Sequence, residues 1–216
     1  MPLSGTYDEQ GTAAKQSVTV LEGMRVLVIG VANERSIAWG CAKEMHRAGA
    51  EIAMTYLNEK ARQYVEPLAR EVNARVFLPL NVQDPAELAR RSEKLMRDGG
   101  TILTMSYFGA DVVIENYGVM GPVKAALEAS VRYLASELGP KNIRVHAISP
   151  GPLATRAASG IPEFDRLMER VAHRAPERRL VTIPEVGAAA VFLASPYARG
   201  MTGGTVFVDG GYHILG

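Results

Sequence analysis

Short runs of apolar residues alternate along the chain with longer stretches in which apolar residues recur every three to four positions. The runs are typical of strands buried in a parallel sheet, and the longer stretches are typical of amphipathic helices. Strands are predicted at 24–29, 51–56, 75–80, 101–107, 143–148 and 205–208, and helices at 36–48, 59–72, 118–138 and from Thr182 onward. This order predicts an α/β fold: a Rossmann-like, doubly wound parallel sheet in a single domain.

Three of these segments carry finer signals. The run at 24–29, MRVLVI, is almost continuously apolar, which predicts a strand buried on both faces in the middle of the sheet. Pro79 has no N–H to donate, so the strand at 75–80 is expected at a sheet edge. Thr182 and Glu185 have the spacing of a capping box, which predicts where the last long helix begins.

Composition and charge are those of an ordinary globular enzyme. The 216 residues include 24 Lys and Arg and 23 Asp and Glu, so positive and negative charges nearly balance. No nucleic-acid-binding surface is therefore indicated. No apolar run is long enough to span a bilayer, and no membrane association is expected. We interpret the polar residues 1–20 as a disordered leader and 21–216 as the folded domain. A single cysteine, Cys41, favours a reducing cytoplasm, and the four histidines form no cluster suited to a metal.

A glycine-containing turn follows the first predicted strand. It runs from Gly30 to Gly40 as GVANERSIAWG, and small residues there let backbone amides and a helix N-terminus approach a pyrophosphate. Ser36 and Ala38 stand where the common G-x-G-x-x-G motif has glycines, so the spacing alone leaves open that Gly30 merely ends a strand and Ser36 merely caps a helix.

The end of the second predicted strand bears on the choice of cofactor. An acid that binds the ribose 2′-hydroxyl is expected about twenty residues after the glycines, but the sequence there is Tyr56-Leu-Asn-Glu59. No arginine stands at the strand tip to neutralise a 2′-phosphate, which favours NADH. Lys60 and Arg62 keep NADPH as an alternative.

Tyr117 and Lys124 are seven residues apart, which corresponds to two turns of the helix predicted to begin near Gly118. An ammonium near a phenol lowers the pKa of the phenol, and this makes the hydroxyl a better proton donor or enolate stabiliser. The same lysine can bind a nicotinamide ribose. By itself this spacing fits a packed tyrosine and a surface lysine equally well. Its position before IRVHAISPGP and after the glycine-containing turn favours a dehydrogenase.

The segments 30–40, 103–140, 143–161 and 202–212 together resemble the short-chain dehydrogenase/reductase superfamily, and within it the type I NADH-dependent enoyl-acyl-carrier-protein reductases. Ketoreductases of the same fold normally have a catalytic serine about thirteen residues before the tyrosine. Here position 104 is threonine and Tyr107 stands nearby. The resemblance therefore implies hydride transfer from NADH to C3 of a trans-2-enoyl thioester on acyl carrier protein, in a cytoplasmic homotetramer.

The resemblance also implies roles for individual residues. Tyr117 would stabilise the enolate, Lys124 would hold the ribose and Tyr107 would line the acyl pocket. Cofactor contacts are implied for Gly30, Ser36, Ile37, Asn81, Val82, Lys124, Gly151, Leu153 and Thr155. Substrate contacts are implied for Tyr107, Tyr117, Met120 and Ala157. Residues 157–174 would form a mobile lid over the substrate, and its arginines at 166, 170 and 174 would either meet the acidic carrier protein or form a solvated helix face.

The sequence departs from the family between Asn81 and Thr101. It offers one helix there, starting at Asp84-Pro85, and no strand, whereas the fold needs another strand and crossover helix. The resemblance places the break near residues 90–92, with roughly 50 residues missing. The missing strand would lie in mid-sheet beside the first strand, so its loss would expose hydrogen-bonding edges and core.

Three hypotheses follow from this departure. In the first, the polypeptide contains a segment that the sequence lacks and is an active enoyl reductase. In the second, the chain is a deleted, non-catalytic scaffold that binds nucleotide or forms oligomers. In the third, it is a ketoacyl or carbonyl reductase of the same superfamily.

Overall fold

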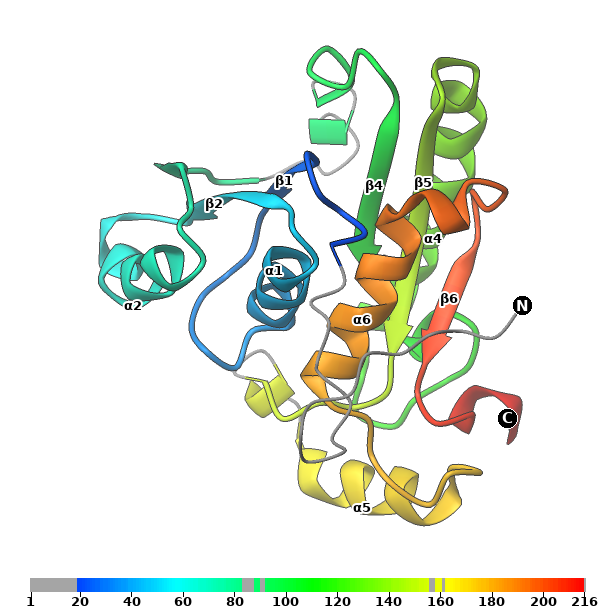
Figure 1. Cartoon of the computed structure of the whole chain (residues 1–216). Coiled ribbons are helices and arrows are strands. Elements are labelled where there is room, and N and C mark those ends of the chain that lie inside the picture. Colours follow the sequence, from blue (N-terminus) through cyan, green and yellow to red (C-terminus); the bar gives the residue numbers. More distant parts are fainter. Residues whose placement is uncertain (1–18, 83–87, 90–91, 156–157, 161, 216) are drawn as a thin grey trace, which may run out of the picture.

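The computed structural model describes residues 19–82, 88–89, 92–155, 158–160 and 162–215, which form two three-stranded sheets with helices packed against them (Figure 1). One sheet has the order β1-β2-β3, and the other has the order β4-β5-β6. The strands are β1 (Arg25–Val28), β2 (Glu51–Tyr56), β3 (Val76–Pro79), β4 (Gly100–Met105), β5 (Ile143–Pro150) and β6 (Thr205–Val208). All of their pairings are parallel, as the alternation of strands and helices predicted.

The helices connect these strands. They are α1 (Ile37–Arg47), α2 (Glu59–Glu71), α4 (Met120–Leu138), α5 (Phe164–Arg174) and α6 (Ile183–Ala194). Short 3-10 turns are η1 (Phe108–Ala110), η2 (Gly139–Lys141), η3 (Ala158–Gly160), η4 (Pro196–Ala198) and η5 (Tyr212–Leu215). The predicted capping box at the start of α6 is confirmed: the Thr182 hydroxyl accepts from the Glu185 amide, and the Glu185 carboxylate accepts from the Thr182 amide. None of the helices in the described part of the chain has the length and apolar character needed to cross a membrane.

The first strand lies at a sheet edge, and the prediction that it would lie in mid-sheet is wrong. β1 pairs only with β2, from Arg25 opposite Glu51 to Val28 opposite Met54, and no other described strand pairs with it or with the outer edge of β4. Leu27 is 47% exposed, so one face of β1 is also uncovered. These free edges are where the missing strand and helix were predicted. The prediction that the strand containing Pro79 is an edge strand is confirmed, because β3 ends its sheet.

β5 separates two layers of core because its side chains alternate between its faces. Ile143, Val145 and Ala147 pack with Val131, Leu134 and Leu138 of α4, whereas Ile148 belongs to the larger core that contains α1 and α6. Helices α4 and α6 therefore cover opposite faces of the sheet β4-β5-β6. The larger core also includes Val28, Ile52 and Met54 of the first sheet, and it therefore continues across the break between the sheets.

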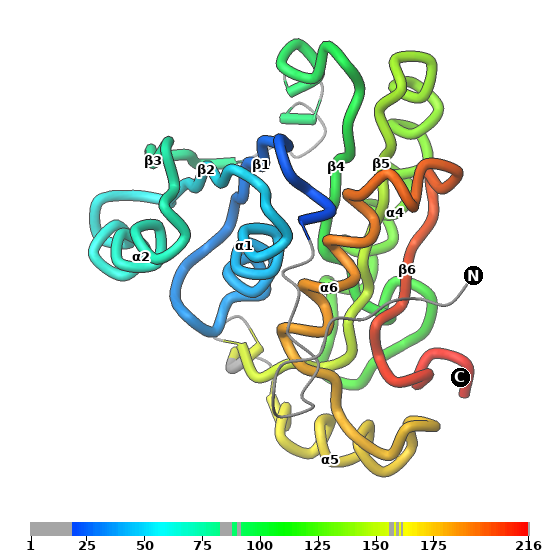
Figure 2. Tube along the Cα trace, in the orientation of Figure 1, coloured from blue at the N-terminus to red at the C-terminus, as the bar shows by residue number. Residues whose placement is uncertain are grey.

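The α1–α6 crossing joins the two sheets, and the helices lie side by side between them in Figure 2. Glycines make this close approach possible. A Cβ at Gly40 would overlap the side chain of Ile183, and a Cβ at Gly187 would lie 2.9 Å from the carbonyl oxygen of Gly40. Two small residues at one crossing thus bring the backbones of both helices together.

The region that carries the predicted break is only partly described. Residues 88–89 and 92–93 are helical, in agreement with a helix after Asp84, and β4 begins at Gly100. Asp84, Pro85 and residues 90–91 lie outside the described residues, as do residues 1–18 of the predicted leader. The position of the break and the leader at 1–20 remain predictions.

Candidate active site

The carboxyl end of β4 carries the first part of the candidate site. The Ser106 amide donates to the Ile148 carbonyl at 2.7 Å, so pairing with β5 continues one residue beyond the strand and fixes the direction of the chain. Ser106 is buried, Tyr107 is half-buried, and η1 begins immediately afterwards at Phe108. The sheet therefore places Tyr107 where the chain leaves β4.

Tyr117 lies in a tight turn before α4. The sequence predicted that it shares a helix face with Lys124, but α4 begins only at Met120, and the prediction is wrong at this point. The neighbours on either side of Tyr117 have left-handed backbones, with φ of 62° at Asn116 and 54° at Gly118. Asparagine and glycine tolerate this conformation better than other residues, and this explains why a helix cannot extend back to Tyr117.

The turn brings Tyr117 against Tyr107, as predicted for two residues of one site. Their ring centroids are 5.0 Å apart with the planes at 60°, an edge-to-face contact. Burial raises the pKa of Tyr117. Burial also raises the pKa of Tyr107, and Tyr212, Tyr117 and Asp209 raise it further. Both phenols are thus held in the neutral form, in which they donate hydrogen bonds.

Gly109 in η1 leaves the space that the Tyr117 ring fills. A Cβ at this position would lie 2.7 Å from Cδ1 and 2.8 Å from Cε1 of Tyr117, and a Cβ at Gly121 of α4 would lie 3.0 Å from the Gly109 carbonyl oxygen. Contacts this short force the neighbouring group to move. The absence of a side chain at Gly109 therefore leaves room for the Tyr117 ring, and its absence at Gly121 lets α4 approach η1.

We expect Gly109→Ala to reduce turnover while the protein stays folded, because the added methyl group displaces the Tyr117 ring. Misplacement of a catalytic group by about 1 Å costs on the order of a hundredfold in rate. The measurement is kcat for enoyl thioester reduction, the reaction that the resemblance implies, together with the melting temperature. Gly139→Ala is the matched control, since a Cβ there meets nothing within 4 Å. Equal kcat for wild type and Gly109→Ala would show that the Tyr117 ring position is not critical.

Lys124 projects from α4 toward the same strand end. Its ammonium donates to the Met105 carbonyl at 2.8 Å, and burial lowers its pKa while Glu128 raises it. The expected lowering of the Tyr117 pKa by Lys124 is wrong for this structure, because burial is the cause that acts on Tyr117. Lys124 reaches the backbone of β4 instead, and the three predicted catalytic residues are grouped around the end of that strand.

The glycine-containing turn connects β1 to α1. Gly30 has φ of 89°, and a Cβ there would meet nothing within 4 Å, so open space adjoins its backbone. The Ser36 hydroxyl accepts from the amides of Ala32 and Asn33, at 3.0 and 3.1 Å, and folds the turn back onto the start of the helix. The first amide to bond back to the Ser36 carbonyl is that of Trp39, which leaves the amides of Ile37 and Ala38 at the helix N-terminus. Open backbone beside a helix N-terminus fits a dinucleotide pyrophosphate.

The other predicted cofactor residues lie at the carboxyl ends of strands. Asn81 and Val82 follow β3, with Asn81 exposed. Gly151 follows β5 and donates to the Val208 carbonyl at 2.9 Å, while Leu153 packs in the same core as Val31 and Ile37. The Thr155 hydroxyl accepts from the Ala158 amide. Met120 is 41% exposed at the start of α4, and Ala157 lies outside the described residues.

The C-terminal segment adds residues that sequence reasoning missed. Asp209 is 5% exposed and accepts from the amides of Gly211 and His213 and from the His213 ring. Phe108 packs edge-to-face on Phe207, Tyr212 and His213. This cluster lies beside Tyr107, whose pKa Asp209 and Tyr212 help to raise. The only sequence signal was the Asp-Gly-Gly after the last strand, which suggests a turn but not which element it contacts.

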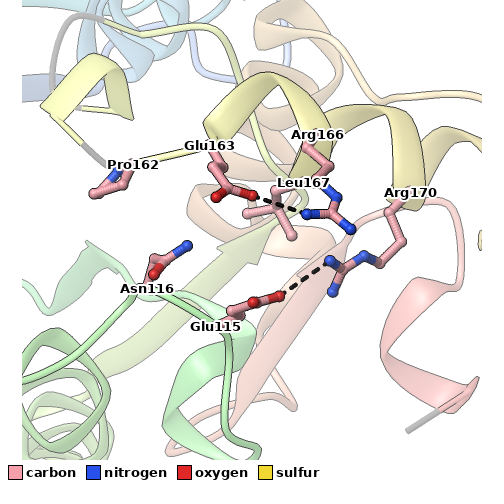
Figure 3. Close-up of a pocket in the computed structure, with 7 residues that line it drawn as sticks. All are labelled: Glu115, Asn116, Pro162, Glu163, Arg166, Leu167 and Arg170. Atoms are coloured by element: carbon pink, nitrogen blue, oxygen red, sulfur yellow. Dashed lines mark hydrogen bonds and ion pairs between the residues drawn. The ribbon is translucent and has the colours of Figure 1, made fainter.

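The predicted lid contains α5, and Figure 3 shows its contact with the turn that precedes Tyr117. Arg170 binds Glu115 of that turn at 3.2 Å, and Arg166 binds Glu163 at 3.1 Å. Glu115, Asn116, Pro162, Glu163, Arg166, Leu167 and Arg170 line a small pocket between the two segments. Two of the three arginines proposed to meet the carrier protein are thus paired with carboxylates of this chain. No group of three or more His, Cys, Asp or Glu suited to a metal occurs among the described residues.

Comparisons with known proteins place this chain in a family. The family model described as enoyl-(acyl carrier protein) reductase matches residues 30–91 and 85–213, in two pieces. The NADH-dependent enoyl-[acyl-carrier-protein] reductase of Bacillus cereus is 38% identical over 254 aligned positions, which cover 91% of this chain and 99% of the relative. One such reductase of Rhizobium meliloti is also 38% identical, with 93% of this chain and 94% of the relative covered.

Solved structures agree with the sequence matches. The reductase of Anaplasma phagocytophilum in complex with NAD superposes with a TM-score of 0.84 at 37% identity, and 91% of this chain and 96% of the other are covered. The Bacillus cereus reductase with NADP⁺ and indole naphthyridinone gives 0.86 at 38% identity, with 91% and 99% covered. Relatives of full length align over more positions than the 216 residues of this chain, consistent with the missing unit. The chain belongs to the enoyl-(acyl carrier protein) reductase family of Rossmann-fold oxidoreductases.

Proposed function

We propose that this chain reduces trans-2-enoyl thioesters carried by acyl carrier protein, with NADH as the reductant. The observation that supports this most directly is the grouping of Tyr107, Tyr117 and Lys124 at the carboxyl end of β4. The matched relatives from Bacillus cereus and Rhizobium meliloti are named NADH-dependent enoyl-[acyl-carrier-protein] reductases, and the family match includes this part of the chain.

The side chains would act in the following way. NADH, held at the Gly30–Ile37 turn and by Lys124, would supply a hydride for C3 of the enoyl group. Tyr117, kept neutral by its raised pKa, would donate a hydrogen bond to the thioester oxygen as negative charge develops there. Tyr107 would pack against the acyl chain and exclude water. A proton from solvent would then be added at C2 and would complete the saturated product.

Two features support NADH over NADPH. After β2 the chain has Asn58, and not an arginine that could neutralise a 2′-phosphate. The Asn58 side chain caps α2 by accepting from the Ala61 amide at 3.0 Å. Arg62, which could have met a 2′-phosphate, is paired with Glu59 and Glu66. The nearby carboxylates would repel the additional phosphate of NADPH.

The alternatives differ in their support. The position at which a ketoacyl reductase normally has its catalytic serine is Thr104 here, and the hydroxyl of the nearby Ser106 donates to the Glu128 carboxylate. The non-catalytic scaffold is favoured by one observation: no other described strand pairs with the free edges of β1 and β4. It therefore remains the second candidate.

One assay separates these candidates. Oxidation of NADH and of NADPH is followed with crotonyl and acetoacetyl thioesters, after the intact mass has been compared with 23.3 kDa. Our proposal expects turnover of the crotonyl thioester, faster with NADH. A carbonyl reductase would turn over the acetoacetyl thioester instead. A scaffold would bind nucleotide and turn over neither, and a mass several kilodaltons larger would indicate a segment additional to this sequence.

We also propose a homotetramer in the cytoplasm, with residues 21–216 as one domain. A single cysteine cannot form a disulfide within the chain, and this supports a reducing compartment. Light scattering of the purified chain tests the tetramer directly.

A further inference from the structure

Glu128 is a buried acid in the candidate site for which the proposed mechanism gives no role. It is 7% exposed, lies on α4 one turn after Lys124, and accepts a hydrogen bond from the buried Ser106 hydroxyl. A carboxylate this deeply buried is costly to a protein unless its charge is used or compensated. Its place beside Lys124 indicates what the charge is for.

Two consecutive residues of the chain leaving β4 are held by one face of α4. Lys124 donates to the Met105 carbonyl, and Glu128 accepts from the Ser106 hydroxyl. The two side chains are four residues apart, so they project from adjacent turns of the same helix face. The residue that follows is Tyr107, whose ring contacts Tyr117. The attachment therefore holds the residue that immediately precedes Tyr107.

We propose that Glu128 is a positioning residue for Lys124: it fastens the end of β4 to α4 through Ser106 and keeps the Lys124 ammonium charged inside the site. The inference rests on the proposed role of Lys124 in binding the cofactor. Glu128 itself touches neither substrate nor cofactor in this scheme.

The electrostatic half of the proposal depends on which charges act on Lys124. Burial lowers the Lys124 pKa, and the Glu128 carboxylate opposes that effect. Tyr107, just before η1, and Tyr117, in the turn before α4, are neutral phenols with raised pKa values. On β5, which packs against α4, Arg144 acts on His146, and neither residue contributes to the pKa of Lys124. Glu128 is thus the charged group in the described structure that stabilises the ammonium.

The direction of the pH effect follows. Lys124 must be protonated to fulfil its role, so activity falls as the pH rises through its pKa. Glu128→Gln keeps an acceptor for Ser106 but removes the negative charge, which lowers the Lys124 pKa further. The alkaline fall in kcat/KM should therefore begin at a lower pH in Glu128→Gln than in wild type. Ser106→Ala removes the hydrogen bond and keeps the charge, so its alkaline limb should stay in place while turnover falls.

A second measurement tests the same proposal and does not depend on enzyme activity. The acetylation rate of Lys124 by acetic anhydride, measured across pH by peptide mass spectrometry, reports the deprotonated fraction of the lysine. We expect the curve for Glu128→Gln to move to lower pH, and that for Ser106→Ala to match wild type. If the enzyme proved inactive but the acetylation curve moved, the proposed function would fail and the Lys124–Glu128 coupling would stand.

Identical acetylation curves for wild type and Glu128→Gln would overturn the proposal. If Glu128→Gln does not fold, the double variant Ser106→Ala/Glu128→Leu removes both hydrogen-bonding partners and leaves no unpaired polar group buried. It must show the same shift to lower pH, and an unshifted curve in that variant would equally overturn the proposal.

Discussion

Tyr117→Phe should abolish most enoyl thioester reduction while the protein remains folded. The ring contact with Tyr107 is kept, but the hydroxyl that would donate to the developing enolate oxygen is lost. Removal of one such donor costs about 10²–10³-fold in kcat in other enzymes. The measurement is the initial rate of NADH oxidation at saturating crotonyl thioester, with circular dichroism to verify the fold.

Tyr133→Phe is the matched control for this variant. Tyr133 lies on the same helix, α4, nine residues after Lys124, and is 79% exposed, so its hydroxyl should contribute nothing to turnover.

Lys124→Met should reduce turnover about as much as Tyr117→Phe does, and it should also raise the KM for NADH. Unchanged enoyl reduction in both Tyr117→Phe and Lys124→Met, in an active preparation, would show that the site has been assigned to the wrong residues.

Gly187→Ala should destabilise the fold by about 1–3 kcal/mol, the usual cost of overpacking a well-packed contact. The new methyl group would lie 2.9 Å from the Gly40 carbonyl oxygen and 2.7 Å from Cγ of Glu44. The backbone oxygen cannot move without displacing α1, and this outweighs the gain of about 1 kcal/mol in helix propensity. The measurement is the free energy of unfolding in urea.

Gly200→Ala serves as the comparison, because a Cβ at that position meets nothing within 4 Å. The α1–α6 crossing joins the sheets, so we expect Gly187→Ala to lower the urea midpoint for both halves together. A Gly187→Ala protein as stable as wild type would mean that the helices can separate slightly at no cost, and that the crossing is less tightly packed than it is in this structure.

Most of the elements could be predicted from the chain, because their signals are local. Short apolar runs between amphipathic stretches located the six strands. Pro79 indicated a sheet edge, and Thr182 with Glu185 marked the start of α6. The position of β1 could not be predicted in this way. Its apolar run is that of a strand with neighbours and cover on both sides, and Leu27 is exposed because the unit that would provide them is missing from the chain.

In the candidate site, too, some residues could be predicted from local signals and others could not. Spacing and resemblance identified Tyr107, Tyr117 and Lys124, which the fold groups together. The left-handed residues at Asn116 and Gly118 showed why Tyr117 precedes the helix, and burial explained why its pKa rises. Phe108 comes from the beginning of the second half of the chain, whereas Asp209 and the aromatic residues that pack on Phe108 come from its end. Their meeting is a property of packing, to which no local pattern corresponds.

The break between the two sheets affects how strongly cofactor binding would stabilise the folded chain. The turn at Gly30 belongs to the first sheet, and Lys124 is attached to the second. A dinucleotide that spans both would connect two halves whose described strands do not pair with each other, and its binding free energy would add to folding as RT ln(1 + [L]/Kd). At a hundred times Kd that amounts to about 2.7 kcal/mol, a large part of the margin of a typical domain. In this chain the cofactor would therefore act as a structural brace as well as a reductant.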